Sequence, residues 1–375
     1  SILSLYLSAF HFFVVTLHND ITKKMVDKFL LAPYYWTLRL RHRLYDKGIL
    51  KSSSSPVPTI CVGNITVGGT GKTPHTEMLI RILQEIPSWK GKHIAVLSRG
   101  YKRKSKGFLI VEADGTADRY GDEPLQIKRK FPEITVAVDK DRNHGCEMLS
   151  RQSTGSKGNR TPAADIIILD DAFQHRALKP SMSIVLVDYN RPVHTDHLLP
   201  IGRLRDIPER IRKADIVIVT KCPAYMEESS KDKWKKDLGI EGTLLFSTVN
   251  YDELEPVFPE GDHRYVHSHR AILFTGIAND APLYTYLGDR YGIMEHFRFG
   301  DHHSFSGKDI RLIGRAAEMF PTALVATTEK DSQRISGRTD IPERMKAKMF
   351  YAPIKVGFLT EEEAALFKEK VSALK

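Results

Sequence analysis

The sequence predicts an α/β protein with a doubly wound parallel sheet, followed by a second, smaller α/β domain. Short β-branched and apolar runs alternate with stretches of helical spacing, which is typical of parallel strands joined by crossover helices. One such run, Thr59–Val62, leads through a glycine-rich turn directly into a helical stretch. The chain has 375 residues, enough for two domains with separate cores.

The bulk composition is that of an ordinary globular protein with an excess of basic residues. The 56 Lys and Arg residues exceed the 46 Asp and Glu residues, giving a net charge of +10. This charge indicates an anionic partner, such as phosphate groups, nucleic acid or a membrane surface. Cys61, Cys146 and Cys222 lie far apart without CxxC spacing. We therefore predict buried thiols in a reducing compartment, and neither a disulfide framework nor a zinc site.

The N-terminal segment, residues 1–50, combines an apolar start with a basic, aromatic continuation. Residues 2–17 are apolar, but at about 16 residues this stretch is marginal for spanning a bilayer, and it lacks the features of a secretory signal. Residues 20–51 interleave Leu, Tyr and Trp with Lys and Arg. Pro33 is predicted in the first turn of a helix that runs to about Tyr45. Such a helix suits a membrane interface, or it packs on the domain as a basic amphipathic helix.

The glycine-rich turn is predicted to be a phosphate-binding P-loop, because a buried strand precedes it and a helical stretch, residues 77–83, follows it. Its backbone N–H groups and the helix N-terminus would surround phosphate oxygens. Lys72 would reach the β- and γ-phosphates, and Thr73 would bind Mg²⁺. One departure is Thr66, which stands where the usual pattern has glycine. The predicted nucleotide-binding residues are Thr66, Val67, Gly68, Gly69, Thr70, Gly71, Lys72 and Thr73.

The rest of the first domain, predicted to cover residues 51–225, continues the alternation of strands and helices. A helix is expected to open at Gly121 with acidic residues in its first turn, where carboxylates are favourable, and another at Asp141. Residues 150–162 are polar and predict a surface loop. Strands are predicted at residues 93–98, 108–111, 134–138, 166–169, 184–187 and 216–219.

Two acidic residues, Asp170 and Asp171, directly follow the buried strand at residues 166–169. In P-loop enzymes such a strand end supplies the carboxylate on the Mg²⁺ side of the phosphates. Together with the Gly71-Lys72-Thr73 sequence, the pair therefore predicts a metal site, without deciding which carboxylate contacts the metal.

The second domain, predicted to cover residues 226–375, has the same alternation in a weaker form. Its final helix is expected to be able to pack back on the first domain. Strands are predicted at residues 244–249, 272–274, 294–299 and 323–327, and helices at 282–291, 306–318 and 361–374.

Taken together, the motifs of this chain resemble those of the tetraacyldisaccharide 4′-kinase family, the lipid A 4′-kinases of Gram-negative bacteria. The resemblance runs from about Phe29 to near the C-terminus, and it includes the P-loop with its missing first glycine. The motifs that carry it, in chain order, are residues 30–51, 56–74, 98–101 (Ser-Arg-Gly-Tyr), 121–124 (Gly-Asp-Glu-Pro), 170–176 (Asp-Asp-Ala-Phe-Gln-His-Arg), 199–205, 275–279, 301–303 (Asp-His-His) and 328–331 (Thr-Glu-Lys-Asp).

The resemblance implies a P-loop NTPase-type sheet domain, a smaller α/β domain and an N-terminal membrane-associated helix. It further implies ATP-dependent, Mg²⁺-assisted phosphorylation of the 4′-hydroxyl of tetraacyldisaccharide 1-phosphate to give lipid IV-A. The lipid substrate and the membrane surface are then the partners, with no nucleic acid and no obligate protein partner. The expected location is the cytoplasmic face of the bacterial inner membrane, held peripherally or by an N-terminal anchor.

The family pattern also assigns roles to residues on the acceptor side. It implies that Asp122 is the general base and that His302 supports it. An Asp–His pair makes chemical sense because an unperturbed Asp is a weak base, with a pKa near 3.9. Arg142 and Arg205 have planar donor forks suited to substrate phosphate or to charge in the transition state. Glu123, Gln174 and His175 are expected to line the site, together with Arg99.

Two other classes of protein fit the sequence less well than this kinase family. Switch and scaffold ATPases that partition or insert cargo carry a lysine just before the two glycines, where this chain has Val67. A nucleic-acid-binding protein is suggested by charge alone, but the basic residues concentrate near the N-terminal helix and no RNA- or DNA-binding motif is found. Both features favour the kinase interpretation.

Overall fold

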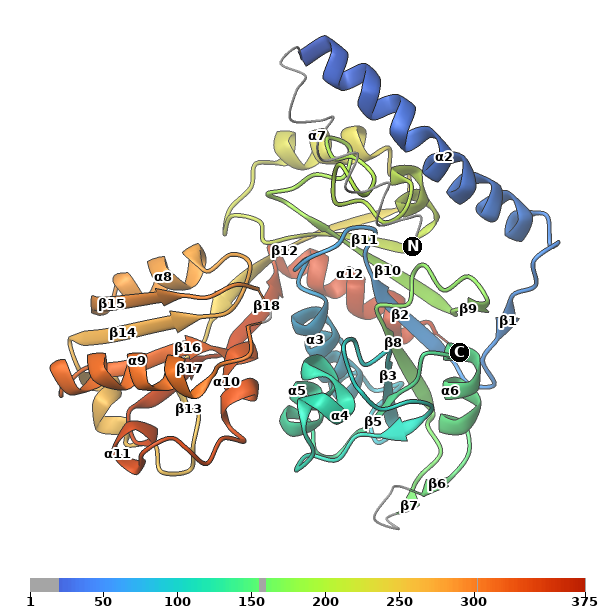
Figure 1. Ribbon diagram of the computed structural model, residues 1–375. Coiled ribbons are helices and arrows are strands. Elements are labelled where there is room, and N and C mark those ends of the chain that lie inside the picture. The colour runs from blue at the N-terminus through green and yellow to red at the C-terminus, as the bar shows by residue number, and fades with distance from the viewer. Residues whose placement is uncertain (1–19, 155–159, 302, 375) are drawn as a thin grey trace.

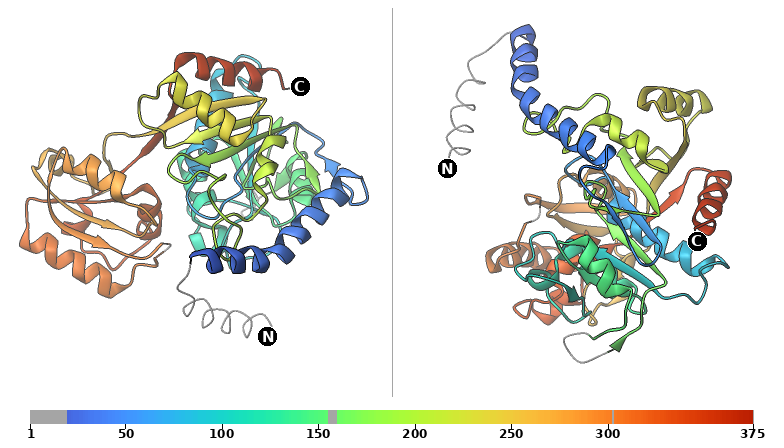
Figure 2. Two further views of the ribbon diagram at one scale, coloured as in Figure 1. Left: turned by 90° about the horizontal axis from the view of Figure 1, so that it is seen from above. Right: turned by 90° about the vertical axis from the view of Figure 1, so that its right-hand side faces the viewer.

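The computed structural model describes residues 20–154, 160–301 and 303–374, which form two α/β units side by side (Figure 1). The larger unit contains a nine-stranded sheet and the smaller unit a five-stranded sheet. Figure 2 shows that the strands connecting the two units lie at one edge of the larger one. The predicted fold class is confirmed, including the second, smaller domain.

The nine-stranded sheet is parallel except for β4 and β18, which pair antiparallel with β5 and β12. The P-loop strand β2 lies in its middle, between β10 and β8. The central strands are parallel, so their carboxyl ends lie at the same edge of the sheet as the end of β2. The strand order is β18 (Ile354–Phe358), β12 (Thr243–Tyr251), β11 (Ile216–Thr220), β10 (Met182–Asp188), β2 (Thr59–Gly63), β8 (Ile166–Asp170), β3 (Ile94–Ser98), β5 (Thr135–Val138), β4 (Leu109–Ile110).

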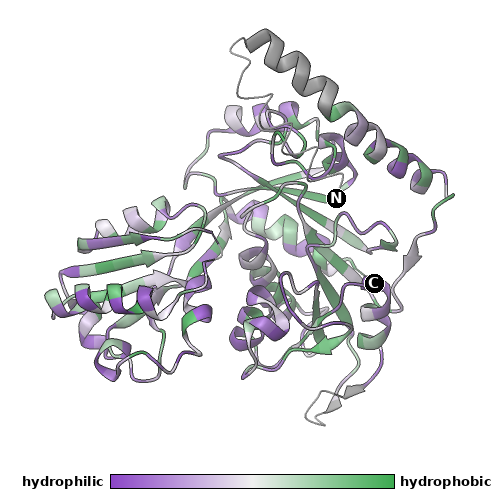
Figure 3. Ribbon diagram, viewed as in Figure 1, coloured by the Kyte–Doolittle hydropathy of each residue, from purple (hydrophilic) through white to green (hydrophobic). Residues whose placement is uncertain are grey.

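Both faces of this sheet are covered, so its central strands are buried along their whole length. Helices α3 (Lys72–Glu85), α5 (Asp122–Lys130) and α12 (Glu361–Ser372) pack on one face, and α6 (Arg142–Leu149) and α7 (Glu228–Leu238) on the other. Figure 3 shows the apolar strands enclosed between helices of mixed polarity. The three cysteines lie in this interior as free thiols, as predicted.

The five-stranded sheet is smaller and carries its helices on both sides. Its strand order is β13 (Glu255–Pro256), β17 (Met349–Ala352), β16 (Leu324–Thr328), β14 (Arg270–Thr275), β15 (Gly292–Arg298). Helix α9 (Gly307–Met319) begins at a capping box, in which Ser306 and Asp309 satisfy each other's backbone N–H groups. The other helices are α8 (Ala281–Gly288), α10 (Glu329–Ile335) and α11 (Glu343–Lys346).

The predicted boundary between residues 225 and 226 is wrong. Helix α7 and the first half of β12 belong to the larger unit, because β12 pairs in parallel with β11. The second half of β12 pairs with β18 and leads into the smaller unit, so these two strands connect the units. Helix α12 then packs on the larger unit through Phe367 and Val371. The boundary was misplaced because Pro223 breaks the alternation, whereas strand pairing over long separations leaves no local signal.

The N-terminal helix is longer than predicted. Helix α2 extends over Asp20–Asp46 with Pro33 inside it, not in its first turn. Pro33 is exposed, so the ring and the missing N–H do not disturb a packed surface. Within residues 20–154, 160–301 and 303–374, no helix combines the length and the apolar character that crossing a bilayer requires. Residues 2–17, predicted to be marginal for spanning, lie outside the described residues.

The predicted surface loop at residues 150–162 contains a small antiparallel ladder between β6 (Ser153–Thr154) and β7 (Arg160–Thr161). Several other short elements had no signal in the sequence. They are β1 (Ser53–Ser54) paired with β9 (Leu178–Lys179), helix α4 (Ala117–Tyr120), and the 3₁₀ helices η1 (Pro208–Lys213) and η2 (His263–His267).

The two units are also joined by an ionic cluster between α5 and α10. Lys130 Nζ lies 2.7 Å from a carboxylate oxygen of Glu77 on α3 and 2.7 Å from one of Glu329 on α10. Gln126 donates to the other oxygen of Glu77 over 2.9 Å. Burial, followed by the charge of Glu329, raises the pKa of Glu77. One cation thus compensates two carboxylates that would otherwise repel each other.

We predict that Lys130→Met destabilises the protein by about 3 kcal/mol near pH 7.5, because it leaves two buried carboxylates with Arg81, 3.6 Å from Glu77, as their remaining counterion among the described pairs. The loss should shrink toward pH 5, since protonation of Glu77 removes the uncompensated charge. Urea unfolding at both pH values measures this. The matched control is Lys368→Met at a surface pair with Glu85 (3.3 Å), which should cost less than about 0.5 kcal/mol. Equal losses in the two variants would contradict the prediction.

Candidate active site

The P-loop connects β2 to α3 at the carboxyl edge of the large sheet. Gly71, directly before α3, has φ +86°, a left-handed conformation that favours glycine. The loop is held from outside by residues 203–205. Val67 N–H donates to the Arg203 carbonyl over 2.8 Å, and Arg205 N–H donates to the Ile65 carbonyl over 2.8 Å. Between these bonds, Thr66 forms an antiparallel bridge with Leu204. Thr66 thus occupies an extended, strand-like position, which explains why the loop does not need glycine there.

Asp170, the last residue of β8, and Asp171, which follows it, lie beside the P-loop, because β8 pairs with β2 and Asp170 stands opposite Val62. Asp170 is buried and accepts a 3.1 Å hydrogen bond from Ser98 Oγ. Asp171 has φ +52°, an unusual conformation for a residue with a side chain. This backbone turn separates the two carboxylates, and Asp171 Oδ1 lies 3.9 Å from Lys72 Nζ.

The two carboxylates ionise differently. Burial, then the charges of Glu123 and Asp171, raises the pKa of Asp170 to about 7. Burial also disfavours the charge on Asp171, but Lys72 and Arg205 outweigh burial and lower its pKa. Arg205 forms a bidentate pair with Asp171. Asp171 is therefore ionised at neutral pH, whereas Asp170 is about half protonated at that pH. A cation bound nearby would favour the ionised form of Asp170.

The residues predicted to hold Mg²⁺ fit a cation. Oδ1 of Asp170 is buried and accepts no hydrogen bond from the described residues, and a buried carboxylate oxygen is costly without a partner. Carboxylate and hydroxyl oxygens such as those of Asp170, Asp171 and Thr73 are ligands that Mg²⁺ prefers. Among the described residues, no group of three or more His, Cys, Asp or Glu side chains forms a preassembled metal site. Phosphate oxygens would have to complete the coordination.

Arg205 and Gln174, both predicted to bind substrate, meet at Asn64. Gln174 Nε2 donates to the Asn64 carbonyl over 2.5 Å, and Arg205 Nη2 donates to the same oxygen over 3.2 Å and to the Asn64 side chain. Asn64 in turn donates to Thr70 Oγ1 over 2.6 Å. The structure therefore brings Arg205, Gln174 and the P-loop together.

Arg142 and His175 are the other predicted substrate-binding residues on this side, and His175 is partly exposed. Arg142 is buried, and its guanidinium donates to the carbonyls of Asp139 and Asp170; burial lowers its pKa. Burial, followed by the charge of Arg142, lowers the pKa of His175. In this geometry Arg142 supports the backbone under the carboxylate pair and does not present its fork to solvent.

Asp122 is the first residue of α5, and a close backbone approach places it. Gly121 has φ +94°, and a Cβ there would lie 3.3 Å from Cα of Gly100, so the 98–101 and 121–124 motifs pack directly together. Oδ2 of Asp122 accepts two hydrogen bonds from Arg334 on α10, over 3.2 and 3.1 Å. Asp122 thus lies between the larger unit and the smaller one.

The first turn of α5 also faces the carboxylate pair and the smaller unit. The charge of Glu123 raises the pKa of Asp170, as noted above, and acts on Lys330 of α10. Burial lowers the pKa of Lys330, while Glu123, Asp301 and Asp122 oppose that shift. The predicted residues Asp122 and Glu123 therefore share one electrostatic environment with Asp170 and with α10.

The Asp-His-His motif follows β15. His302, the predicted partner of Asp122, lies outside the described residues. His303 is held by the smaller unit: its Nε2 lies 3.0 Å from Asp309 Oδ2, and its ring stacks on Phe299 at 4.6 Å between centroids.

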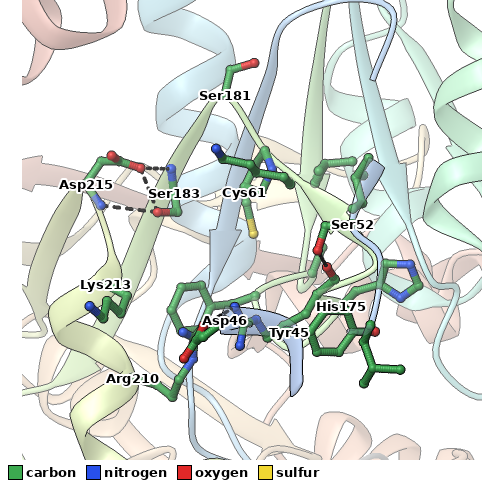
Figure 4. A pocket seen from close by; sticks show the side chains of 18 of the residues that line it. Tyr45, Asp46, Ser52, Cys61, His175, Ser181, Ser183, Arg210, Lys213 and Asp215 are labelled. Atoms are coloured by element: carbon green, nitrogen blue, oxygen red, sulfur yellow. Dashed lines mark hydrogen bonds and ion pairs between the residues drawn. The ribbon is translucent and has the colours of Figure 1, made fainter. Parts of the chain in front are cut away.

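A cavity of about 770 Å³ lies behind the 171–181 loop, between the end of α2, η1 and the face of the sheet (Figure 4). Leu169, Phe173 and Leu178 contribute apolar surface, and Arg210 stacks over the Phe173 ring at 5.3 Å. His175 lines the cavity as well, so the cavity adjoins the residues around Asp170. The cavity lining also carries charged side chains, of which the cations outnumber the carboxylates: Lys51, Arg176, Lys179, Arg210 and Lys213 against Asp46, which pairs with Arg176, and Asp215.

Sequence reasoning missed three residues that organise this site: Asn64, Ser98 and Arg334. Asn64 and Ser98 lie inside recognised motifs, but several of their partners, Gln174, Arg205 and Asp170, come from distant segments of the chain. Arg334 follows the Thr-Glu-Lys-Asp motif by three residues, so helical spacing placed it beside Asp331, to which it is paired at 2.7 Å. No local pattern indicated its contact with Asp122.

Comparisons with known proteins agree along most of the chain. The family model for tetraacyldisaccharide-1-P 4′-kinase matches residues 28–372. The tetraacyldisaccharide 4′-kinase of Phocaeicola vulgatus is 42% identical over 341 residues, covering 89% of this chain and 90% of the relative. The one from Flavobacterium johnsoniae is 36% identical over 347 residues, covering 92% and 95%. A crystal structure of LpxK from Aquifex aeolicus in complex with ATP superposes with a TM-score of 0.66 at 26% identity, covering 92% of this chain and 99% of that chain.

We predict opposite effects on stability for the two carboxylates of the β8 end. Between about pH 4 and 7 the folded protein retains a proton on Asp170 that the unfolded chain releases, so this group lowers stability as pH rises through that window. Asp170→Asn should therefore stabilise the nucleotide-free protein at pH 8 and flatten the decline between pH 5 and 8.

Asp171→Asn should destabilise the protein at pH 8, because it removes the carboxylate that pairs with Lys72 and Arg205. Urea unfolding without Mg²⁺ or ATP measures both variants. Destabilisation by Asp170→Asn at pH 8 would contradict the assigned ionisation.

Proposed function

We propose, for a chain that belongs to the tetraacyldisaccharide-1-P 4′-kinase family, that the residues around the carboxyl end of β2 bind ATP and Mg²⁺ and activate the sugar hydroxyl. The protein is an ATP-dependent kinase that phosphorylates the 4′-hydroxyl of tetraacyldisaccharide 1-phosphate in lipid A biosynthesis. The observation that carries the finer proposal is the convergence of the P-loop, the Asp170–Asp171 pair and the first turn of α5.

On the nucleotide side, residues 66–73 would surround the phosphates, with Lys72 at the β- and γ-phosphates. Phosphoryl transfer depends mainly on positioning and on neutralising charge on the phosphoryl oxygens. Thr73 and Asp170 or Asp171 would hold Mg²⁺, whose charge would be shared between phosphate oxygens. The orphaned Oδ1 of Asp170 supports this assignment. Lys72 now pairs with Asp171 at 3.9 Å, so the same carboxylate that orients Lys72 lies beside the proposed metal position.

On the acceptor side, Asp122 would accept the proton of the 4′-hydroxyl. Arg334 supports this role, because its two hydrogen bonds to Oδ2 fix the orientation of the Asp122 carboxylate. A base must be oriented before its proton affinity matters. Since Arg334 comes from the smaller unit, the position of that unit affects the base. The family role of His302 as a supporting histidine remains part of this proposal.

The remaining predicted site residues are assigned different roles according to their contacts and burial. We assign Arg205 to phosphate or transition-state charge, because it lies half-buried beside Lys72 and Asp171. Gln174 would hold Asn64 and the loop in place, and Glu123 would tune the charge around Asp170. Arg142 would act from beneath as a fixed positive charge. His175, neutral because burial lowers its pKa, would line the path between the site and the cavity.

Helix α2 is proposed to bring the enzyme to the membrane that holds its lipid substrate. One side of the helix contacts the site: Tyr34 donates to the Arg205 carbonyl over 3.3 Å, and His42 pairs with buried Asp206 at 2.6 Å. The other side exposes Trp36 and Leu40, 56% and 58% accessible and four residues apart. Residues at this spacing lie on one helix face. Packing on the domain and a role at the membrane are therefore compatible.

The cavity beneath α2 (Figure 4) suits part of an amphiphilic, phosphorylated substrate. Its apolar floor would accept hydrocarbon, and its cationic side chains would accept anionic groups. This placement agrees with the excess positive charge of the chain. We therefore propose a peripheral or N-terminally anchored enzyme at the cytoplasmic face of the inner membrane, which needs neither nucleic acid nor an obligate protein partner.

We predict that Lys72→Met and Asp122→Asn each lower the turnover of tetraacyldisaccharide 1-phosphate at least roughly a hundredfold. They should differ in nucleotide binding: Lys72→Met weakens ATP affinity, whereas Asp122→Asn leaves it nearly unchanged. A kinase assay in detergent micelles and calorimetric titration with ATP measure the two effects. The control is Asp118→Asn, which removes an exposed ion pair with Lys104. Wild-type turnover by Asp122→Asn would refute the assigned base.

We predict that the double variant Trp36→Ser/Leu40→Ser floats at least roughly tenfold less well with vesicles that contain phosphatidylglycerol, because it removes two exposed apolar side chains. Its ATP affinity should stay unchanged, since neither residue contacts the P-loop. Met319→Ser on α9 is the matched control, because Met319 is 69% exposed and belongs to the smaller unit. Flotation that depends equally on Met319 would argue against α2 as the membrane contact.

A further inference from the structure

Three consecutive carbonyl groups of the P-loop, those of Gly69, Thr70 and Gly71, each accept a hydrogen bond from a side chain behind the loop. Lys221 Nζ donates to the Gly69 carbonyl, Thr220 Oγ1 donates to the Thr70 carbonyl over 2.9 Å, and His75 Nδ1 lies 2.7 Å from the Gly71 carbonyl. None of the three side chains belongs to the nucleotide-binding residues assigned above.

The direction of these carbonyls fixes the direction of the neighbouring N–H groups. In a planar trans peptide, the C=O of one residue and the N–H of the next point to opposite sides. Carbonyls of Thr70 and Gly71 turned toward Thr220 and His75 therefore turn the N–H groups of Gly71 and Lys72 to the other side of the loop. Neither N–H donates to a backbone acceptor in the turns and loops of the described chain. These are the donors that a phosphate needs.

His75 is built into this arrangement. Its ring is 2% exposed, and its second nitrogen, Nε2, lies 2.9 Å from Ser247 Oγ. Each ring nitrogen faces a neutral group, the Gly71 carbonyl on one side and the Ser247 hydroxyl on the other. A carbonyl oxygen can only accept, so Nδ1 carries the hydrogen and Nε2 accepts from the Ser247 hydroxyl.

Thr220 and Lys221 are equally constrained. Thr220 is the last residue of β11 and is fully buried. Lys221 has φ +58°, and its ammonium lies between the Gly69 carbonyl and Asp188, 2.6 Å from the carboxylate. Ser247, which orients His75, lies on β12 at the first pair with β18, where the connection to the smaller unit begins (Figure 1). The side chains that hold the P-loop carbonyls are thus themselves held by β11 and by β12, one of the two connecting strands.

We propose that His75, Thr220 and Lys221 are positioning residues that hold the P-loop carbonyls away from the nucleotide. The N–H groups of Gly71 and Lys72 then face ATP before ATP arrives, whereas the Thr70 N–H donates to the Gly68 carbonyl over 3.0 Å. This inference rests on the proposed ATP site. It assigns a role to three residues outside the glycine-rich motif, and it makes Ser247 the residue that fixes the orientation of the His75 ring.

The test is calorimetric titration of the full chain with ATP and Mg²⁺, without lipid. Thr220→Val removes the hydroxyl but keeps the β-branched shape, and it should weaken ATP binding by about threefold to tenfold, as expected for one buried hydrogen bond. Thr135→Val is the matched control, because Thr135 is also a buried strand threonine whose hydroxyl bonds a histidine, His93, at 2.7 Å. Thr135→Val should leave ATP affinity unchanged.

Two substitutions separate the contacts of His75. The amide of His75→Asn can replace Nδ1 and should keep ATP affinity within about threefold of the wild type, whereas the amide of His75→Gln reaches toward Ser247 and should lose about tenfold. In kinase assays, the KM for ATP should rise in His75→Gln while kcat at saturating ATP falls much less. A merely structural role would lower thermal stability in both variants without this difference.

Each outcome decides a separate point. Absence of ATP binding by the wild type would refute the proposed nucleotide site itself. ATP binding by the wild type, with equal affinity in Thr220→Val and His75→Gln, would overturn the positioning role alone. If His75→Gln does not fold, Thr220→Val against Thr135→Val still decides the question.

Discussion

The parallel pairing of β2 with β8 is the constraint on which the rest of the site depends. It places Val62 opposite Asp170, so the loop that leaves β2 and the carboxylates that end β8 emerge at the same edge of the sheet. Both strands are buried on both faces, and a shift in register would bury polar side chains without partners. The apolar interior thus fixes the distance between the phosphate-binding loop and the acidic pair.

The buried charged groups around the end of β8 lower the stability of the folded protein. Asp170 and Arg142 are buried, and burial shifts the pKa of each toward its neutral form. Asp171 stays ionised because Lys72 and Arg205 flank it. The site therefore contains opposed charges in an ordered hydrogen-bond network, and Oδ1 of Asp170 accepts no hydrogen bond from the part of the chain that the structure describes. Such preorganised charge favours the binding of cation and phosphate, because little reorganisation is needed when they bind.

The smaller unit takes part in the site through side chains and not only as a cover. Arg334 reaches Asp122, and Lys130 bridges Glu77 and Glu329, so these ion pairs join α5 to α10. The two units are connected in the chain through β12 and β18, and Ser247 of β12 contacts the histidine behind the P-loop. Asp122, the P-loop and the connecting strands are therefore linked through side-chain contacts. Helix α2 also contacts the site, through hydrogen bonds to residues 205 and 206. The segment proposed to face the membrane therefore also supports the site.

The sequence by itself determined most strands of the large sheet, the P-loop, the acidic pair and the family, because these features are local: hydrophobic period, glycine spacing and motif order. Tertiary structure decided what depends on contacts between distant segments. It assigned β12, β18 and α12 to the larger unit, enclosed Pro33 within a long helix, and brought Arg334 to Asp122. It also separated residues that look alike in the sequence, burying Arg142 while leaving Arg205 beside Lys72. The physical reason is that burial and charge pairing are properties of a neighbourhood, and the neighbourhood forms only when strands far apart in the chain lie side by side.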